Sequence, residues 1–213
     1  MRDKLFITSI GILVVAILIF IAWYARTNPL SNSGGEQNGV ISISDSDWAI
    51  GEKNAPITLV EYADFQCPGC GAYHPIVKKV LEDNAGKIYF VFRHFPLTQI
   101  HANALLAATA AEAAGKQGKF WEMHDLIFKN QSEWSSATNA KPIFIRYAKN
   151  IGLDEGPFSK DISDGTIVEK IKAQYDEGVK IGVDRTPTFF LNGKKLKDNP
   201  STYEAFNKLI NAQ

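Results

Sequence analysis

Residues 57–70 read ITLVEYADFQCPGC, and they hold both cysteines of the 213-residue chain. The run 57–64 follows Pro56 and is mostly apolar or β-branched, which predicts a buried strand. Pro68 suits the first turn of a helix, where its missing N–H costs nothing. Apolar residues then recur every three or four positions and predict a helix over 68–84. The stretch therefore predicts a strand that carries Cys67 to the start of a helix.

The chain after this stretch extends the same unit. Residues 87–95, KIYFVFRHF, predict a second strand, and the two strands with their helix form a βαβ unit. Such units carry their functional sites at the carboxyl ends of the strands, where the cysteines lie.

A helical block and a final hairpin complete the order of elements. Helical patterns without strand signals occur at 102–114, 120–129, 141–150 and 166–179. Strands are predicted at 187–191 and 194–197, joined by an Asn192-Gly193 turn, and a helix at 203–210. The order is βαβ, helical insertion, ββα.

The N-terminal segment predicts a membrane anchor. Leu5–Ala25 contains 21 residues without a charge, enough for a helix to cross roughly 30 Å of hydrocarbon. Arg2 and Lys4 precede it, so the positive-inside rule predicts a cytoplasmic N-terminus and an extracytoplasmic remainder. A cleaved signal peptide is the alternative, but the apolar run exceeds the ~7–15 residues usual there, and a small-residue cleavage pattern is lacking.

The predicted domain organisation has three parts. Residues 1–26 hold the cytoplasmic stub and anchor, and 27–47 form a flexible linker rich in Gly, Ser and Asn. A short edge strand at 40–43 is an alternative within that linker. Residues 48–213 form the main folded domain, with its helical insertion at about 98–182.

Composition narrows the class of function. The formal net charge is zero, so no strong field points to nucleic acid as a partner. Two cysteines at this spacing in a chain of this length are not a disulfide framework, which favours a reactive role.

Disulfide exchange needs a thiolate, and a helix N-terminus favours one. Cys67 is therefore the predicted nucleophile and Cys70, one turn inward, the buried resolving thiol. Glu61 is a charge in an apolar strand, which suggests a function for it. A metal-binding or metallochaperone domain using Cys67, Cys70 and His74 is the alternative of a different class, although a closed site needs a fourth ligand.

Four stretches together resemble a known family: 61–70 (EYADFQCPGC), 92–97 (FRHFPL), 118–124 (GKFWEMH) and 182–188 (GVDRTPT). They are similar to those of the DsbA-like thiol:disulfide oxidoreductases of the thioredoxin superfamily. The resemblance covers roughly residues 45–212.

The resemblance implies an α/β fold of thioredoxin type, a mixed β-sheet flanked by helices, with an inserted helical subdomain. It implies that Glu61 assists proton transfer at the buried cysteine, and that a cis Thr186–Pro187 bond lies beside the disulfide. Thr186, Pro187, Pro68 and Gly69 would contact the substrate. No cofactor or metal is implied beyond the cysteine pair.

The resulting hypothesis is a monomeric disulfide oxidase, anchored by one span in the plasma membrane with its catalytic domain outside. Its substrates would be thiols of secreted proteins, and a membrane quinone-linked thiol oxidase would reoxidise it. The Pro68-Gly69 spacer lacks the histidine of the most oxidising family members, which argues against extreme oxidising power. A reductase or isomerase on the same fold is the alternative.

Overall fold

The computed structural model describes residues 17–20, 23–24, 26 and 41–213. It divides into two units, Met1–Gln37 and Asn38–Gln213. In the first unit the described residues are helical. Among all described residues, no helix has the length and apolar character needed to cross a membrane. The predicted anchor, Leu5–Ala25, lies largely outside the described residues and stays a prediction.

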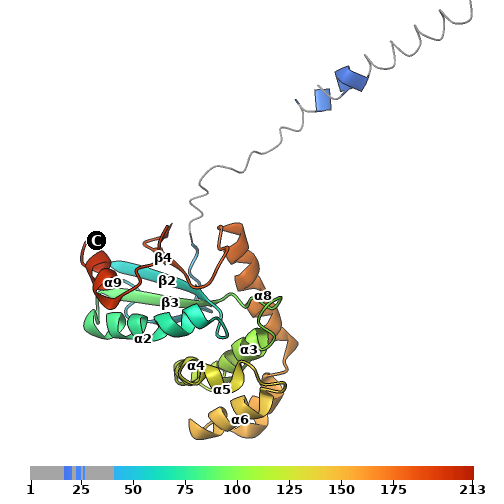
Figure 1. Cartoon of the computed structure of the whole chain (residues 1–213), viewed down its shortest axis with the longest axis vertical. Coiled ribbons are helices and arrows are strands. Elements are labelled where there is room, and N and C mark those ends of the chain that lie inside the picture. The colour runs from blue at the N-terminus through green and yellow to red at the C-terminus, as the bar shows by residue number, and fades with distance from the viewer. Residues whose placement is uncertain (1–16, 21–22, 25, 27–40) are drawn as a thin grey trace, which may run out of the picture. The chain divides into compact units, whose positions relative to one another are not determined.

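The second unit is built on a five-stranded mixed sheet of order β1-β3-β2-β4-β5 (Figure 1). The strands are β1 (Trp48–Ile50), β2 (Ile57–Ala63), β3 (Ile88–His94), β4 (Thr188–Leu191) and β5 (Lys194–Lys195). The central pair, β2 and β3, is parallel, whereas β4 pairs antiparallel with β2. Parallel strands need a crossover, and α2 (Pro68–Asp83) provides it. The predicted βαβ and ββα units are thus confirmed.

Side chains alternate between the two faces of β2 and sort into two cores. Leu59 packs in a large cluster with residues of α2, the insertion and α9 (Tyr203–Ile210). Val60 and Tyr62 point to the opposite face and pack in a smaller cluster. Because Glu61 has the parity of Leu59, it faces the larger cluster.

The helical insertion occupies the chain between β3 and β4. It comprises α3 (Ala104–Gly115), α4 (Phe120–Lys129), α5 (Gln131–Trp134), α6 (Lys141–Asn150), α7 (Glu155–Asp161) and α8 (Gly165–Lys180). The short helices α5 and α7 were not predicted. Asp154 and Asp164 cap α7 and α8 by accepting from the backbone N–H groups of Gly156 and Thr166.

The edge of the sheet differs from the sequence prediction. Of residues 40–43, the described ones, 41–43, form no strand. The edge strand is instead β1, which pairs antiparallel with β3. Trp48 fixes it in place by stacking on Phe120 at 4.4 Å between ring centroids and by donating its Nε1–H to Glu112.

Residues 41–47, assigned to the linker from the sequence, belong to the folded unit. Arg93 of β3 is buried and holds them: it donates to both carboxylate oxygens of Asp47 and to the carbonyl oxygen of Ser42. Local composition is polar here, and the partner that orders it is about 46 residues away in the chain.

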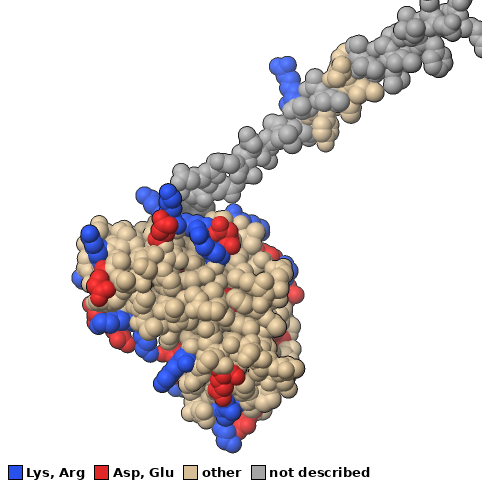
Figure 2. All heavy atoms as spheres, in the orientation of Figure 1, with Lys and Arg blue, Asp and Glu red and all other residues tan. Residues whose placement is uncertain are grey.

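The face of this unit seen in Figure 2 carries few charged side chains, and those at its margins are of both signs. This agrees with the zero formal net charge.

Candidate active site

Cys67 lies where β2 has ended and α2 begins. It is the N-cap of α2, with extended backbone angles (φ −67°, ψ 121°), and Pro68 occupies the first turn. Cys70 is one turn further along the helix and fully buried, whereas Cys67 is half-buried. Both sulfurs are free thiols in this structure. One sulfur is therefore accessible to a partner and the other is not.

The surroundings of Cys67 stabilise its thiolate. Its pKa is lowered to about 5, chiefly because the Cys70 thiol donates a hydrogen bond to it. The Thr186 hydroxyl and the backbone N–H groups of Gly69 and Cys70 add to this effect, and burial opposes it. As a thiol, Cys67 instead donates to the Thr186 carbonyl oxygen at 3.4 Å. Cys67 is consequently ionised at neutral pH.

Cys70 has the opposite electrostatic environment. Burial raises the pKa of Cys70, and its hydrogen bond to Cys67 and the nearby charges of Cys67 and Glu61 raise it further. The backbone N–H of Asp64 lies 3.5 Å from the Cys70 sulfur. The pair thus combines an ionised outer thiol with a protonated inner thiol.

Thr186 and Pro187 form one wall of the site. Their peptide bond is cis, as the resemblance implies. A Cβ atom added at Gly69 would lie 3.5 Å from both the Cys67 sulfur and the Pro187 ring, so these three residues adjoin one another. The Thr186 hydroxyl is buried and makes no hydrogen bond within the described part of the chain. It is thus free to donate to the Cys67 thiolate.

Glu61 lies behind the cysteine pair. It is 4% exposed, and burial raises its pKa to about 8. When ionised, it is one of the causes that raise the pKa of Cys70. A carboxyl with this pKa exchanges a proton near neutral pH, as a proton carrier for a buried thiol requires.

Gln131 was missed by the sequence analysis. From α5 it donates its side-chain N–H to the carbonyl oxygens of Phe65 and Cys67, at 2.7 and 2.9 Å. A Cβ at position 71 would lie 2.8 Å from the Gln131 Oε1 atom, so Gly71 leaves room for this contact. The helical insertion therefore supports the loop that carries Cys67. Local sequence carries no signal for a contact between residues 64 positions apart.

The sequence analysis also assigned no role to Asp64. Its buried carboxylate accepts from the backbone N–H groups of Gln66 and Leu97 and lies 2.6 Å from the His101 Nδ1 atom. These bonds join the loop before Cys67 to the loop after β3. The signal was an acidic residue at the end of an apolar strand.

The metal site suggested from Cys67, Cys70 and His74 is not formed in the described part of the chain. The Nε2 atom of His74 lies 3.0 Å from the Asp125 Oδ1 atom of α4. The residues grouped with it are His124 and Asp125. Helical spacing alone did not reveal that His74 lies on the α4 side of α2.

Comparison with known proteins gives a family match over most of the chain. The model described as Thioredoxin matches residues 44–212. Two relatives are Na(+)/H(+) antiporters: NhaA 3 of Salinispora tropica, 39% identical over 83% of this chain, and NhaA 1 of Mycobacterium sp. (strain KMS), 32% identical over 88%. The chain spans 27% and 31% of the length of these two proteins.

Several solved structures share the fold. Wolbachia pipientis alpha-DsbA1 superposes with a TM-score of 0.69 and 25% identity, covering 82% of this chain and 94% of that one. Oxidised BdbD from Bacillus subtilis superposes with a TM-score of 0.68 and 24% identity, covering 77% of this chain and 90% of that one. MdbA, a thiol-disulfide oxidoreductase from Corynebacterium diphtheriae, superposes with a TM-score of 0.66 and 22% identity, covering 79% of this chain and 91% of that one. The last two support the fold alone.

Proposed function

The chain belongs to the thioredoxin family, and from this premise we propose that it is a DsbA-like thiol-disulfide oxidoreductase that works as an oxidase on secreted proteins. The observation that carries the proposal is the stabilised thiolate of Cys67 beside the buried thiol of Cys70. Stabilising the reduced form makes a disulfide a stronger oxidant. A low pKa also makes Cys67 a good leaving group.

The reaction moves two electrons from substrate to enzyme. A substrate thiolate attacks the Cys67 sulfur of the oxidised enzyme, the Cys67–Cys70 bond breaks, and Cys70 leaves as a thiolate. Cys70 takes a proton, which Glu61 supplies because its raised pKa keeps it protonated at neutral pH. A second substrate thiolate then attacks the substrate sulfur of the mixed disulfide. Cys67 leaves as a thiolate, and the substrate holds a new disulfide.

The wall formed by Thr186 and Pro187 would receive the substrate chain. Pro187 offers no N–H, and the carbonyl oxygen of Thr186 already faces the Cys67 sulfur. Pro68 is exposed and Gly69 partly exposed, so both can touch an extended segment lying across the site. Backbone pairing with such a segment does not depend on the side chains of the substrate, which suits an enzyme with many substrates.

Membrane anchoring is part of the proposal. Leu5–Ala25 would hold the enzyme in the plasma membrane, with the thioredoxin-like unit on the oxidising side. A quinone-linked thiol oxidase in the same membrane would reoxidise the cysteine pair, and the enzyme would act as a monomer. Antiport is not proposed for this chain, because it spans less than a third of the antiporters it resembles.

Trapping of substrate tests the reaction. In Cys70→Ala, the Cys67 thiolate can attack a disulfide of a secreted protein and release one substrate sulfur as a thiolate. The enzyme then has no second thiol to break the mixed disulfide, so secreted proteins should accumulate in a reducible adduct. The double variant Cys67→Ala, Cys70→Ala is the control and should trap none. Equal trapping by both variants, or by neither, would overturn the assignment of Cys67 as the nucleophile.

A redox titration against glutathione tests the direction. A potential near −120 mV would support an oxidase, whereas one near −270 mV would support the alternative, a reductase.

A further inference from the structure

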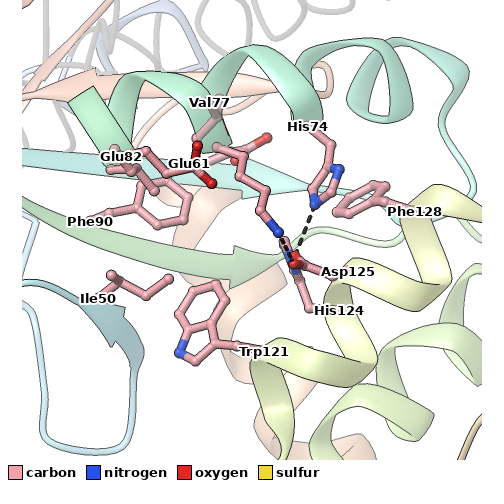
Figure 3. A pocket seen from close by; sticks show the side chains of 12 residues that line it. Ile50, Glu61, His74, Val77, Glu82, Phe90, Trp121, His124, Asp125 and Phe128 are labelled. Atoms are coloured by element: carbon pink, nitrogen blue, oxygen red, sulfur yellow. Dashed lines mark hydrogen bonds and ion pairs between the residues drawn. The ribbon is translucent and has the colours of Figure 1, made fainter. Parts of the chain in front are cut away.

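A cavity of about 280 Å³ lies between α2 and α4, on the face of the sheet that Glu61 occupies (Figure 3). Its apolar wall includes Phe90, Trp121 and Phe128. Its polar lining comprises six residues, Glu61, His74, Lys78, Glu82, His124 and Asp125. None of the polar residues except Glu61 enters the proposed redox reaction.

Three of these side chains converge at one point. His74 Nε2 and His124 Nδ1 lie 3.0 and 3.1 Å from the same oxygen, Oδ1 of Asp125. One ligand atom of each residue lies within 4.8 Å of the other two. Figure 3 shows His74 on α2 and Asp125 on α4 facing each other across the gap. In a tetrahedral site with bonds of about 2.0–2.1 Å, ligand atoms are roughly 3.3 Å apart.

We propose that His74, His124 and Asp125 form a binding site for a divalent transition-metal ion, with Zn²⁺ as the best match. Two imidazoles and one carboxylate are a common protein donor set for Zn²⁺, and they leave the fourth position to water. The hydrogen bonds that now join the three residues would be replaced by bonds to the ion.

The ammonium group of Lys78 already pairs with Asp125. Its Nζ atom lies 2.5 Å from the second carboxylate oxygen of Asp125, so this carboxylate already binds a cation. The Lys78 side chain is 52% exposed and can swing into solvent when a metal binds Asp125. Lys78 therefore competes with the metal for Asp125.

Glu61 supplies an independent observation. It is almost fully buried and lines the same cavity, yet its carboxyl has no hydrogen-bond partner within the described residues. Buried polar groups without a partner are uncommon and call for one. The cavity that these residues line is large enough to hold water, which would give the Glu61 carboxyl a partner and fill the fourth position of the ion.

The site would join two parts of the fold. His74 lies on α2, one turn after Cys70, whereas His124 and Asp125 lie on α4 of the insertion. A bound ion would fasten the insertion to the helix that carries the cysteines. Because the metal binds the folded state, it should stabilise that state by an amount that grows with the logarithm of its concentration relative to its dissociation constant. This inference does not depend on the redox function.

Titration of the oxidised full-length protein tests the proposal. With the Cys67–Cys70 disulfide formed, the thiols cannot bind metal. Calorimetric titration with Zn²⁺ should give one site per chain, and Co²⁺ should give the visible absorption of a tetrahedral ion. Asp125→Asn and His74→Gln should each weaken binding about 10-fold or more. Lys78→Met should tighten it, since the competing ammonium is gone.

Lys79→Met is the matched control, because Lys79 is the adjacent lysine of α2 and pairs with Asp83 instead. It should leave Zn²⁺ affinity unchanged. In thermal unfolding, Zn²⁺ should raise the Tm of the wild type and of Lys79→Met but not of Asp125→Asn. Failure of the oxidised protein to bind Zn²⁺ saturably would overturn the proposal, and so would undiminished binding by Asp125→Asn and His74→Gln.

Discussion

The side-chain amide of Gln131 donates to the carbonyl oxygen of Cys67 at 2.9 Å. Gln131 belongs to the helical insertion, and Cys67 is the proposed nucleophile of the thioredoxin-like unit. The insertion is therefore not simply an addition to one side of the fold. It sets the position of the loop from which the reactive sulfur projects.

Gln131→Ala should destabilise the protein by about 1–3 kcal/mol, because two carbonyl oxygens, those of Phe65 and Cys67, lose their donor. Urea denaturation measures the change. Gln117→Ala also removes a glutamine with two hydrogen bonds, but these are exposed, so its effect should be smaller. Equal losses would show that Gln131 gives the loop no special support.

Alkylation of the reduced protein should follow the pKa of Cys67. Since that pKa is lowered to about 5, the rate should rise through pH 5 and be nearly constant above pH ~7. An ordinary cysteine, with a pKa of about 8.5, would still be gaining reactivity there. Buried Cys70 should remain unmodified, which mass spectrometry of the products will show.

Thr186→Val should raise the pKa of Cys67 by about one, because the thiolate loses a hydrogen bond from the hydroxyl. Thiolate absorbance recorded against pH reports the change. Thr109→Val removes a hydroxyl that bonds within α3, and it should leave the titration of Cys67 as in the wild type. An unchanged pKa in Thr186→Val would mean that the hydroxyl does not contact the thiolate.

Glu61 should make stability fall as pH rises. Its pKa is 4.5 in the unfolded reference and about 8 in the folded protein, so the folded state holds the extra proton between these values. The contribution of Glu61 to the free energy of unfolding is fully present below pH ~4.5. It declines between pH ~4.5 and pH ~8, because the unfolded state binds fewer protons than the folded state in that range. Denaturation at several pH values should show a flatter profile for Glu61→Gln, and the wild-type profile for the exposed Glu204→Gln.

Gly115→Ala should destabilise the protein by about 1–3 kcal/mol. The new methyl group would lie 2.2 Å from the ring of Trp48, the residue that holds the edge strand β1. Gly165→Ala is the control, since no atom lies within 4 Å of a methyl group there. Thermal unfolding should rank Gly165→Ala at or above the wild type, and equal behaviour of the two variants would contradict the close packing at Trp48.

The elements that sequence predicts well are those with a local cause. Strands β2 and β3 are continuous apolar runs, and Gly or Pro residues mark the ends of most helices. The helix at 68–84 ends within one residue of the observed Asp83. In contrast, β1 has three residues and is stabilised by Trp48 contacts with the distant Phe120 and Glu112, so no periodicity reveals it.

The site divides in the same way. Cys67, Cys70 and Glu61 stand out because a thiol pair and a lone charge are unusual in their local setting. Gln131 and the group of His74, His124 and Asp125 are ordinary residues on amphipathic helices. Their significance comes from the packing of α2 on α4 and α5, which joins positions about 50 to 64 apart in the chain.

Arg93 should make the edge of the sheet near the N-terminal side resistant to tension. Tension applied from the N-terminal side would reach Ser42 and Asp47 before it reaches β1, and both are fastened to the buried guanidinium. The load would pass into the middle of the sheet through β3, and the edge strand would not be peeled off one hydrogen bond at a time. Ser42 and Asp47 would thus protect the edge strand from tension that arrives through the preceding chain.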